Sequence, residues 1–313
     1  MIKESLYYAK ILLFGEYGII EDSMGLSIPY TFFKGKFEFA NPLNNVQLDS
    51  NQSIRKFVEH LMQLNDKNEL PCTFDFNRLF NDLDNGLYFD SSIPQGFGVG
   101  SSGALVAALY NQYALNQVSA DDVMKGDNLS NLKFILSSLE SYFHGKSSGL
   151  DPLICYLNLP ILIKGKGDLG AVGMPTENTE GKGAIFLMDS GSPGKTQGMV
   201  AIFLQKLKDE GFRNLVRTQL KKYNDGAVKS FLKGENKPLF ENVKAISSLF
   251  LDNFKPMIPS KFEDIWRKGL ETNAYYLKLC GSGGGGFVLG FTQDYEKAEK
   301  MLKGHKLQVI YKI

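Results

Sequence analysis

A glycine-rich segment, Pro94–Ala104, has the composition of a loop that binds phosphate. It reads Pro-Gln-Gly-Phe-Gly-Val-Gly-Ser-Ser-Gly-Ala and leads directly into a stretch rich in Ala and Leu that predicts a helix. Glycines let the backbone approach a ligand closely, and the N–H groups and dipole at a helix N-terminus attract anions. Ser101 and Ser102 offer N-caps, and a serine hydroxyl here suits a Mg²⁺ ion carried by a nucleotide. The segment therefore predicts a phosphate-binding loop that is not of the Walker type.

Two familiar loop patterns match only in part. Gly98–Gly103 and Gly281–Gly286 both fit G-x-G-x-x-G, which in a dinucleotide site follows directly on a buried strand. Ser91–Gln95 contains a proline and does not read as such a strand. Gly194-Lys195-Thr196 is similar to the end of a Walker loop, but the first glycine of that loop would fall on Asp189. Tight turns without a ligand are the remaining alternative for both glycine stretches.

Two carboxylates stand where they can serve such a site. Glu140 and His144 are four residues apart, on one face of a predicted helix that ends at Gly145. Asp151 follows a glycine-bearing turn, from which a carboxylate can project into a cleft. A solvated helix charge for Glu140 and a helix N-cap for Asp151 are the alternatives that the residues alone leave open.

Strands and helices alternate in both halves of the chain, which predicts an α/β protein. Strands are predicted within Tyr7–Ile20 and Phe32–Phe39 and at Ile185–Met188, Phe287–Phe291 and Leu307–Ile313. Helices are predicted at Ser53–Leu64, Ala104–Leu115, Leu129–Phe143 and Tyr295–Leu302, and Gln197–Leu279 reads as mostly helical, broken near Gly211, Gly234 and Pro256–Pro259. The stretch Lys164–Gly183 contains six glycines and is the expected boundary, with domains at 1–180 and 181–313.

The overall composition narrows the class of protein. A length of 313 residues suggests about two domains. With 35 Lys and Arg against 34 Asp and Glu, no net field favours nucleic acid or an anionic membrane. The first fifteen residues are not expected to form a signal peptide, and the apolar stretch Leu150–Ile163 is too short and too polar to be expected to span a membrane. Three widely spaced cysteines favour a reduced, cytoplasmic protein.

Three separated segments resemble, in order, the motifs of the GHMP kinases, the superfamily of galactokinase, homoserine kinase, mevalonate kinase and phosphomevalonate kinase. Lys10–Tyr17 is similar to the first motif, Pro94–Ala104 to the ATP-binding motif P-x-G-x-G-L-G-S-S-A, and Lys278–Gly286 to the third. Glu140–Asp151 is similar to the E-x-x-x-H-G-x-P-S-G-x-D stretch of mevalonate kinases and their close relatives. The resemblance spans nearly the whole chain.

The resemblance implies a two-domain α/β (α+β) fold, with an N-terminal ribosomal protein S5-like domain, a C-terminal ferredoxin-like domain and the active site in the cleft between them. It implies ATP and Mg²⁺ as cofactors, with Glu140 and Ser102 as Mg²⁺ ligands. Asp151 is the implied base for the substrate hydroxyl, and Lys10 stabilises charge on the transferring group. The implied nucleotide-binding residues are Pro94, Gly96, Gly98, Val99, Gly100, Ser101, Ser102 and Gly103.

The resemblance also implies residues that contact or border the substrate: Glu16, His144, Ser148, Gly149, Thr196, Gly283 and Gly284. Thr196 enters because Asp189-Ser190-Gly191 followed by Thr196 is similar to a D-T-G-x-x-x-x-T segment of mevalonate kinases. The third motif is expected to pack near the phosphate loop, about 180 residues away in sequence. The sequence departs from the family pattern where Ser147 replaces the usual proline, Gly103 the usual alanine and Cys280 the usual threonine.

The expected activity is ATP-dependent phosphorylation of a small-molecule alcohol. Mevalonate is the expected acceptor, which would yield 5-phosphomevalonate for isoprenoid biosynthesis. Tyr17 stands where many mevalonate kinases have histidine, and a Gly-Glu-Tyr triplet is also common in phosphomevalonate kinases. Phosphomevalonate is therefore the alternative acceptor, and a sugar the third. Only five arginines occur, which favours the unphosphorylated acceptor. A non-catalytic nucleotide sensor is the alternative outside the enzymes; no nucleic-acid or membrane partner is expected, and a homodimer is one open oligomeric state.

Overall fold

The computed structural model describes residues 5–118, 122–123, 125–165, 168–194 and 196–313, and of residues 144, 196 and 197 it describes the backbone only. Within these residues the chain forms two compact units. Unit 1 takes in the described residues of Met1–Lys10, Pro29–Pro94 and Gly100–Leu159, and unit 2 takes in those of Ile11–Ile28, Gln95–Val99 and Pro160–Ile313. Because each unit gathers several chain segments, a single boundary at residue 180 stays a prediction.

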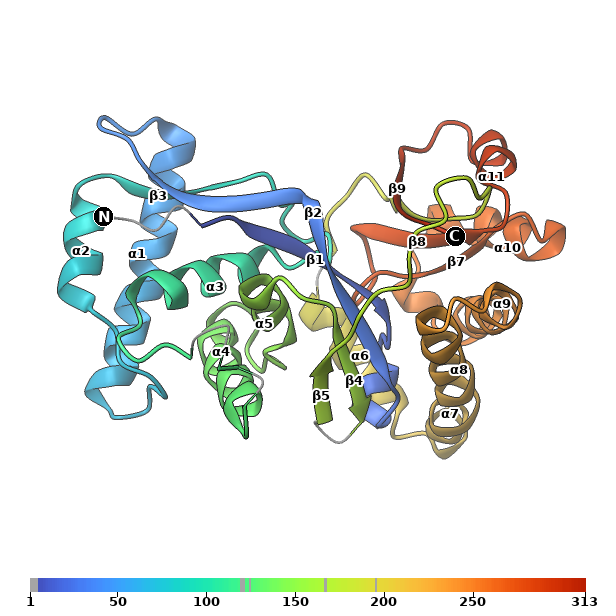
Figure 1. The fold of residues 1–313 in the computed structure, drawn as a ribbon, viewed down its shortest axis with the longest axis horizontal. Coiled ribbons are helices and arrows are strands. Elements are labelled where there is room, and N and C mark those ends of the chain that lie inside the picture. Colours follow the sequence, from blue (N-terminus) through green and yellow to red (C-terminus); the bar gives the residue numbers. More distant parts are fainter. Residues whose placement is uncertain (1–4, 119–121, 124, 166–167, 195) are drawn as a thin grey trace. The chain divides into compact units, whose positions relative to one another are not determined.

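Unit 1 is mainly helical. Its helices are α1 (Asn45–Asp66), α2 (Phe76–Asp84), α3 (Ser101–Tyr113), α4 (Asn128–His144) and α5 (Leu150–Leu157). Helix α3 carries Ala, Val, Leu and Tyr around most of its circumference and is buried accordingly. It packs against α4 and α5 (Figure 1), so the N-terminal turns of α3 and α5 belong to one helical cluster.

Two long strands contribute residues to both units. Strand β2 (Gly25–Phe39) pairs antiparallel in its second half with β3 (Leu87–Ser91), inside unit 1. In its first half it pairs antiparallel with β4 (Ile161–Gly165), inside unit 2, and β4 pairs in turn with β5 (Asp168–Ala171). Strand β1 (Tyr7–Phe14) lies beside β2 in the same sheet.

The second sheet, in unit 2, has four antiparallel strands. They are β6 (Ala184–Asp189), β7 (Tyr276–Leu279), β8 (Phe287–Thr292) and β9 (Leu307–Lys312), and their spatial order is β7-β8-β6-β9. Helices connect β6 to β7 and β8 to β9, which gives the β-α-β-β-α-β succession of a ferredoxin-like fold. The predicted two-domain fold with a ferredoxin-like C-terminal part is thereby confirmed.

Unit 2 carries its helices mainly between β6 and β7. They are α6 (Thr196–Lys206), α7 (Glu210–Leu215), α8 (Lys221–Leu232), α9 (Asn236–Asn253), α10 (Glu263–Thr272) and, after β8, α11 (Tyr295–Met301). A π-helical stretch, Val216–Leu220, joins α7 to α8, and short 3₁₀ helices lie at Gly18–Glu21, Lys255–Met257 and Ser260–Phe262. Helices α8 and α9 lie side by side (Figure 1).

Most elements predicted from periodicity are confirmed, and the exceptions are short. The pattern predicts helix as far as Leu279, but Asn273 ends α10 in the left-handed conformation and Tyr276–Leu279 pairs with β8. The predicted break near Gly211 is confirmed, since α6 ends at Lys206 and α7 begins at Glu210. Helix α2 and strand β3 are not predicted, because nine and five residues give too little periodicity to recognise.

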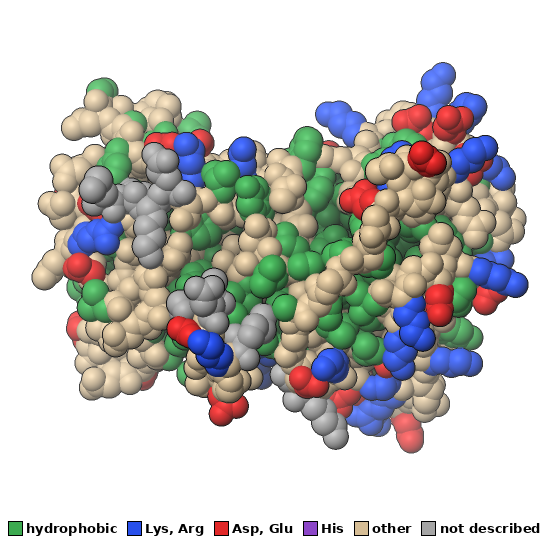
Figure 2. All heavy atoms as spheres, viewed as in Figure 1, with side chains coloured by type: hydrophobic (Ala, Val, Ile, Leu, Met, Phe, Trp, Pro, Cys, Tyr) green, Lys and Arg blue, Asp and Glu red, His purple; other side chains and the backbone are tan. Residues whose placement is uncertain are grey.

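The surface charges and the hydropathy of the helices both agree with the composition. On the face shown in Figure 2, acidic side chains lie among the basic ones, as a net charge of +1 leads one to expect. Among the described helices, none combines the length with the apolar character that a membrane span requires. The apolar stretch Leu150–Ile163 instead forms α5 and the start of β4.

Candidate active site

The second half of the glycine loop opens helix α3 in unit 1. Gly100 is the N-cap residue, with φ of 82°, and Ser101 and Ser102 are the first two helical residues. The expectation that these serines cap the helix is therefore wrong, because the left-handed conformation that starts the helix falls on the glycine before them. The first-turn N–H groups have no carbonyl of the helix itself to bind, so they and the helix dipole favour an anion.

The first half of the loop belongs to unit 2 and packs on the third glycine motif. A Cβ atom on Gly98 would lie 2.8 Å from the carbonyl oxygen of Cys280, and one on Gly286 would lie 2.7 Å from the Cα of Phe97. These backbones approach so closely that only glycine fits. The prediction that the two distant glycine stretches meet is thus confirmed.

Glu140 is a buried carboxylate on α4, only 4% exposed. Ser102 Oγ donates to its Oε1 at 3.1 Å, and Ser147 Oγ donates to its Oε2 at 2.5 Å. Burial, together with the negative charge of Asp151, raises the pKa of the Glu140 carboxyl from 4.5 to about 7, although the two serine hydrogen bonds lower it. The alternative of a solvated helix charge is therefore wrong.

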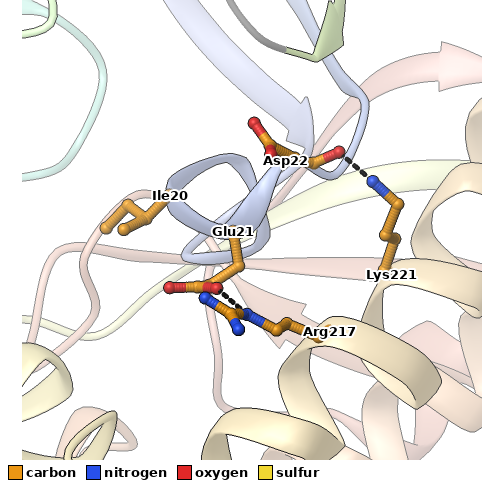
Figure 3. Close-up of a pocket in the computed structure, with 5 residues that line it drawn as sticks. All are labelled: Ile20, Glu21, Asp22, Arg217 and Lys221. Atoms are coloured by element: carbon orange, nitrogen blue, oxygen red, sulfur yellow. Dashed lines mark hydrogen bonds and ion pairs between the residues drawn. The ribbon is translucent and has the colours of Figure 1, made fainter.

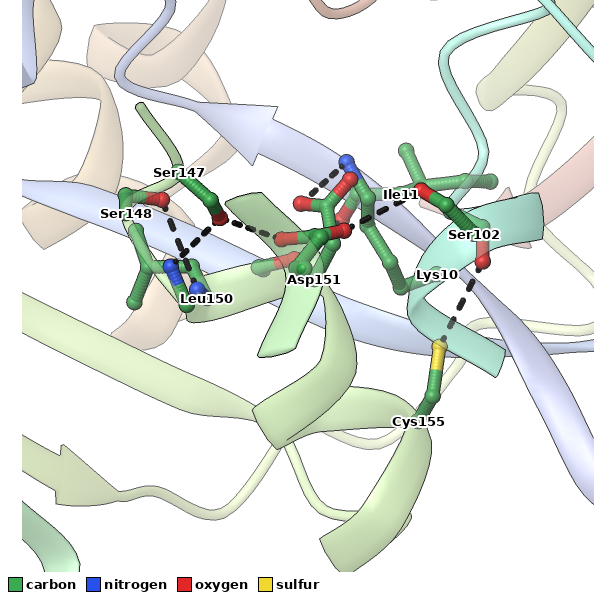
Figure 4. Close-up of polar contacts among 12 residues, drawn as sticks. Lys10, Ile11, Ser102, Ser147, Ser148, Leu150, Asp151 and Cys155 are labelled. Atoms are coloured by element: carbon green, nitrogen blue, oxygen red, sulfur yellow. Dashed lines mark hydrogen bonds and ion pairs between the residues drawn. The ribbon is translucent and has the colours of Figure 1, made fainter. Parts of the chain in front are cut away.

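Asp151 forms an ion pair with Lys10. Lys10 Nζ lies 2.9 Å from Asp151 Oδ1, and the two side chains point toward one another in Figure 4. The lysine side chain is 5% exposed, whereas that of Asp151 is 36% exposed, so the carboxylate remains accessible to a ligand. The N-cap of α5 is Gly149 and Asp151 lies in the first helical turn, so the N-cap alternative for Asp151 is also wrong.

Helix α3 touches the backbone that carries Asp151. A Cβ atom on Gly103 would lie 2.8 Å from the carbonyl carbon of Asp151 and 2.8 Å from the nitrogen of Pro152. Glycine at this position therefore lets α3 and α5 approach closely. The distance between Ser102, one residue earlier, and the first turn of α5 depends on this contact.

The oxygen atoms gathered here suit a magnesium ion that is also held by phosphates. Ser102 and Glu140 offer a hydroxyl and a carboxylate, and Mg²⁺ is commonly bound by one or two carboxylates together with substrate phosphates and water. Within the described residues, no group of three or more His, Cys, Asp or Glu could hold a metal by itself. The residues thus fit an ion that arrives with a nucleotide.

In unit 2, Glu16 forms a buried ion pair with Lys278 of strand β7. Lys278 Nζ lies 2.5 Å from Glu16 Oε1, and both side chains are 1% exposed. The next residue, Tyr17, donates its hydroxyl hydrogen to the carbonyl oxygen of Ser282 at 2.5 Å. These two contacts tie the first motif to the third, and the predicted substrate role of Glu16 stays a prediction.

The other predicted residues fall into both units. Ser148 is exposed and its hydroxyl accepts a weak hydrogen bond from the N–H of Leu150, at 3.4 Å. Pro94 is half-buried, whereas Val99 is fully buried. Gly283 is buried and Gly284 is exposed in the third motif. The side chains of His144 and Thr196 lie outside the described residues.

The sequence alone assigns no individual role to three residues that contact these segments, namely Ser147, Lys261 and Lys278. For Ser147 the available signal is its departure from the proline of the family pattern. For Lys278 it is a single charge within the apolar stretch Tyr276–Leu279. Lys261, whose ammonium donates to the carbonyl oxygen of Ser190, gives no signal in the sequence.

A pocket of about 360 Å³ in unit 2 lies outside these clusters (Figure 3). Arg217, from the π-helical stretch, forms an ion pair with Glu21, and Lys221 donates to the backbone carbonyl of Asp22. The two cations that line the pocket are thus engaged with the segment that follows the first motif. This arrangement fastens that segment to α8 and its preceding turn.

Comparison with protein families gives two matches. The family described as "GHMP kinases N terminal domain" matches residues 57–158, and "GHMP kinases C terminal" matches residues 228–306. Together the matches cover more than half of the chain. No curated protein matches the sequence at a significant level.

Solved structures with a similar fold include three enzymes. The L. major mevalonate kinase in complex with R-mevalonate is 15% identical, with a TM-score of 0.63 over 97% of this chain and 91% of that one. The Streptococcus pneumoniae phosphomevalonate kinase in complex with phosphomevalonate and AMPPNP is 15% identical, with a TM-score of 0.62 over 98% and 99%. The Methanococcus jannaschii mevalonate kinase is 17% identical, with a TM-score of 0.62 over 99% and 98%. At these identities the likeness concerns the fold.

Proposed function

Because this chain belongs to the GHMP kinases, which use ATP, we propose that it transfers the γ-phosphate of ATP to the hydroxyl of mevalonate and forms 5-phosphomevalonate. The observation that carries the proposal is the cluster in unit 1. There the Lys10–Asp151 ion pair lies beside Glu140, whose carboxylate receives a hydrogen bond from Ser102 at the start of α3. Phosphoryl transfer depends mainly on positioning and on charge stabilisation, and this cluster supplies groups for both.

Asp151 is the proposed acceptor of the substrate proton. Its carboxylate is 36% exposed and is oriented by the ammonium of Lys10, 2.9 Å away. As the substrate oxygen attacks the γ-phosphorus and the bond to the leaving ADP oxygen breaks, the hydroxyl proton passes to an Asp151 oxygen. Lys10 offers positive charge to the transferring group from a buried position on strand β1.

The start of α3 is the proposed phosphate site. The first-turn N–H groups after Gly100 and the helix dipole attract phosphate oxygens, and the hydroxyl of Ser102 lies within the same turn. Ser102 and Glu140 would hold Mg²⁺, which when bound neutralises phosphate charge. Without the ion, the negative charge of the buried Glu140 carboxylate is unfavourable, which its raised pKa reflects.

The arginines support an acceptor without a phosphate. Four of the five make contacts with protein groups of their own unit: Arg55 with Asp84, Arg78 with the carbonyl of Gln112, Arg213 with the carbonyl of Leu207, and Arg217 with Glu21. An arginine that is engaged in this way is poorly placed to clamp a second phosphate. Mevalonate is therefore the preferred acceptor.

One observation favours 5-phosphomevalonate as a second candidate. The Lys261 ammonium lies 3.4 Å from the position that a Cβ on Gly191 would take, in the segment that the family resemblance places beside the acceptor. That segment is hydrogen-bonded to the third glycine motif, since the N–H of Ser190 donates to the carbonyl of Gly286 at 2.9 Å. The ammonium donates one hydrogen to the carbonyl of Ser190, and its other two N–H groups suit a phosphate on the acceptor.

A coupled assay of ADP release tests the proposal, with mevalonate, 5-phosphomevalonate and galactose as acceptors. Preferred turnover of mevalonate supports the proposal. Preferred turnover of 5-phosphomevalonate or galactose refutes mevalonate as the acceptor. ATP binding without turnover of any alcohol would instead favour a nucleotide sensor. If 5-phosphomevalonate is the acceptor, Lys261→Ala should raise its KM about tenfold or more, the loss expected for one charged contact.

A cytoplasmic location and a homodimer remain predictions. The first rests on the cysteine usage and on the first fifteen residues, which are not expected to form a signal peptide. The second is tested by measuring the molar mass of the protein in solution.

A further inference from the structure

Ser147 connects the two carboxylates of the proposed active site. Its hydroxyl donates to Glu140 Oε2 at 2.5 Å and accepts a hydrogen bond from the N–H of Gly149 at 3.0 Å. Gly149 is the N-cap residue of α5, the helix whose first turn carries Asp151. One hydroxyl therefore links a side chain of α4 to the backbone from which Asp151 projects (Figure 4).

The turn that carries Ser147 is itself fixed on α4. Ser137 Oγ donates to the carbonyl oxygen of Ser147 at 2.6 Å, and the N–H of Ser147 donates to Ser141 Oγ at 3.3 Å. Gly149, with φ of 73°, approaches α4 so closely that a Cβ would lie 2.4 Å from the carbonyl oxygen of Lys133. The backbone of Ser147 is thus fixed on α4, which limits the positions that its hydroxyl can take.

Glu140 needs such a donor. The last torsion of a glutamate side chain has broad, shallow preferences, so the carboxylate plane of Glu140 is set by its hydrogen bonds. Ser102 contacts Oε1 and Ser147 contacts Oε2, one on each oxygen. Each carboxylate oxygen has a further acceptor site, so the two serines fix the plane and still leave room for a cation.

We infer that Ser147 is a positioning residue, which holds the Glu140 carboxylate in the orientation that binds the divalent cation of the bound nucleotide. The inference rests on the proposed function, because it assumes that Glu140 is a metal ligand. Hydrogen-bond partners of metal ligands typically contribute tenfold to a hundredfold in metal affinity or activity. A serine that only stabilised the turn would affect stability and leave metal affinity unchanged.

The test measures Mn²⁺ affinity by electron paramagnetic resonance, with the full chain and saturating AMPPNP. Ser147→Ala should weaken Mn²⁺ binding roughly tenfold or more, and Ser147→Thr, which keeps the hydroxyl, should restore most of it. AMPPNP affinity in EDTA should not change. Ser130→Ala, at an exposed position of α4, is the matched control and should behave as the parent.

Two results overturn the inference, and they are distinguishable. If Glu140→Gln weakens Mn²⁺ binding but Ser147→Ala does not, Ser147 is not a positioning residue, while the proposed metal site stands. If Glu140→Gln leaves Mn²⁺ affinity unchanged, the metal role in the proposed function is wrong and the inference falls with it. Loss of Mn²⁺ affinity in Ser147→Ala without rescue by Ser147→Thr also counts against it, since it points to a disturbed turn.

Discussion

Replacing Glu140 by glutamine should change how the stability of the metal-free protein depends on pH. The Glu140 carboxyl is 4% exposed and lies near Asp151, and its pKa is raised from 4.5 to about 7. Between these two values the folded protein holds a proton that the unfolded chain has released. The contribution of Glu140 to stability is therefore most favourable below pH 4.5 and declines as pH rises through about 7.

The size of this decline follows from the two pKa values. A tenfold change in the proton equilibrium corresponds to about 1.4 kcal/mol, so the difference between 4.5 and about 7 corresponds to about 3 kcal/mol. Above about pH 8 the buried carboxylate should destabilise the metal-free fold by this order. A glutamine side chain cannot ionise, so in Glu140→Gln that part of the pH dependence should disappear.

The assay is guanidinium denaturation in EDTA at about pH 5.5 and about pH 8.5, which gives the free energy of unfolding at each pH by linear extrapolation. The measured quantity is the difference between the two pH values, because the amide of glutamine also changes the hydrogen bonds with Ser102 and Ser147 at both. Glu59→Gln, at an exposed position of α1, is the control and should show the parent's difference. If Glu140→Gln and the parent lose equal stability between these pH values, the reasoning about the buried charge is wrong.

Three further substitutions test other parts of the structure. Asp151→Asn should lower kcat by roughly 10²–10⁴-fold while ATP affinity, measured by titration, is retained; near-normal turnover would refute the role of Asp151 as base. Gly103→Ala places a Cβ 2.8 Å from the backbone that joins residues 151 and 152. Although alanine is the better helix former, kcat should fall about tenfold or more, because the added methyl group displaces the turn that carries Asp151. Gly198→Ala in α6 is the control, since a Cβ there meets nothing within 4 Å, and it should leave kcat unchanged. Lys278→Met removes the ammonium that pairs with the buried carboxylate of Glu16 and should reduce the free energy of unfolding by about 3–5 kcal/mol. Adding Glu16→Gln removes the buried charge as well and should recover much of this loss. Equal losses in the single and the double variant would contradict this reasoning.

The longer helices can be predicted from the sequence, because the residue pattern that indicates each of them lies within its own segment. Helix α3 follows from an uninterrupted run of Ala and Leu after the glycine loop, and α4 from apolar residues at helical spacing up to Gly145. Strand β7 is not predicted, because four residues are too few to show a period and the helical pattern before them predicts that the helix continues. Its assignment depends on antiparallel pairing with β8 across the glycine-rich loop 280–286, which the residues of β7 alone do not reveal.

The chemistry of the site divides in the same way. The residue types that suit phosphoryl transfer, Lys10, Ser102, Glu140 and Asp151, stand out through motifs, and their proposed roles come from the family resemblance. The contacts among these residues cannot be recognised in the motifs. The hydrogen bond from Ser102 to Glu140 joins residues 38 positions apart, and the N-cap of α3 is Gly100 rather than a serine. Ser147 shows the limit most clearly, because only its contacts in the fold reveal a link between Glu140 and the turn before Asp151.

By itself, the sequence determined which residue types are available and where most of the longer helices and strands lie, since both depend on neighbours along the chain. It also predicted that the two glycine stretches meet, and the approach of Gly98 to Cys280 confirms this. Only the tertiary structure decided which carboxylate is buried, which is paired and which is accessible. Burial and pairing are made by residues that are distant in the sequence, and they set the pKa of Glu140 and the exposure of Asp151.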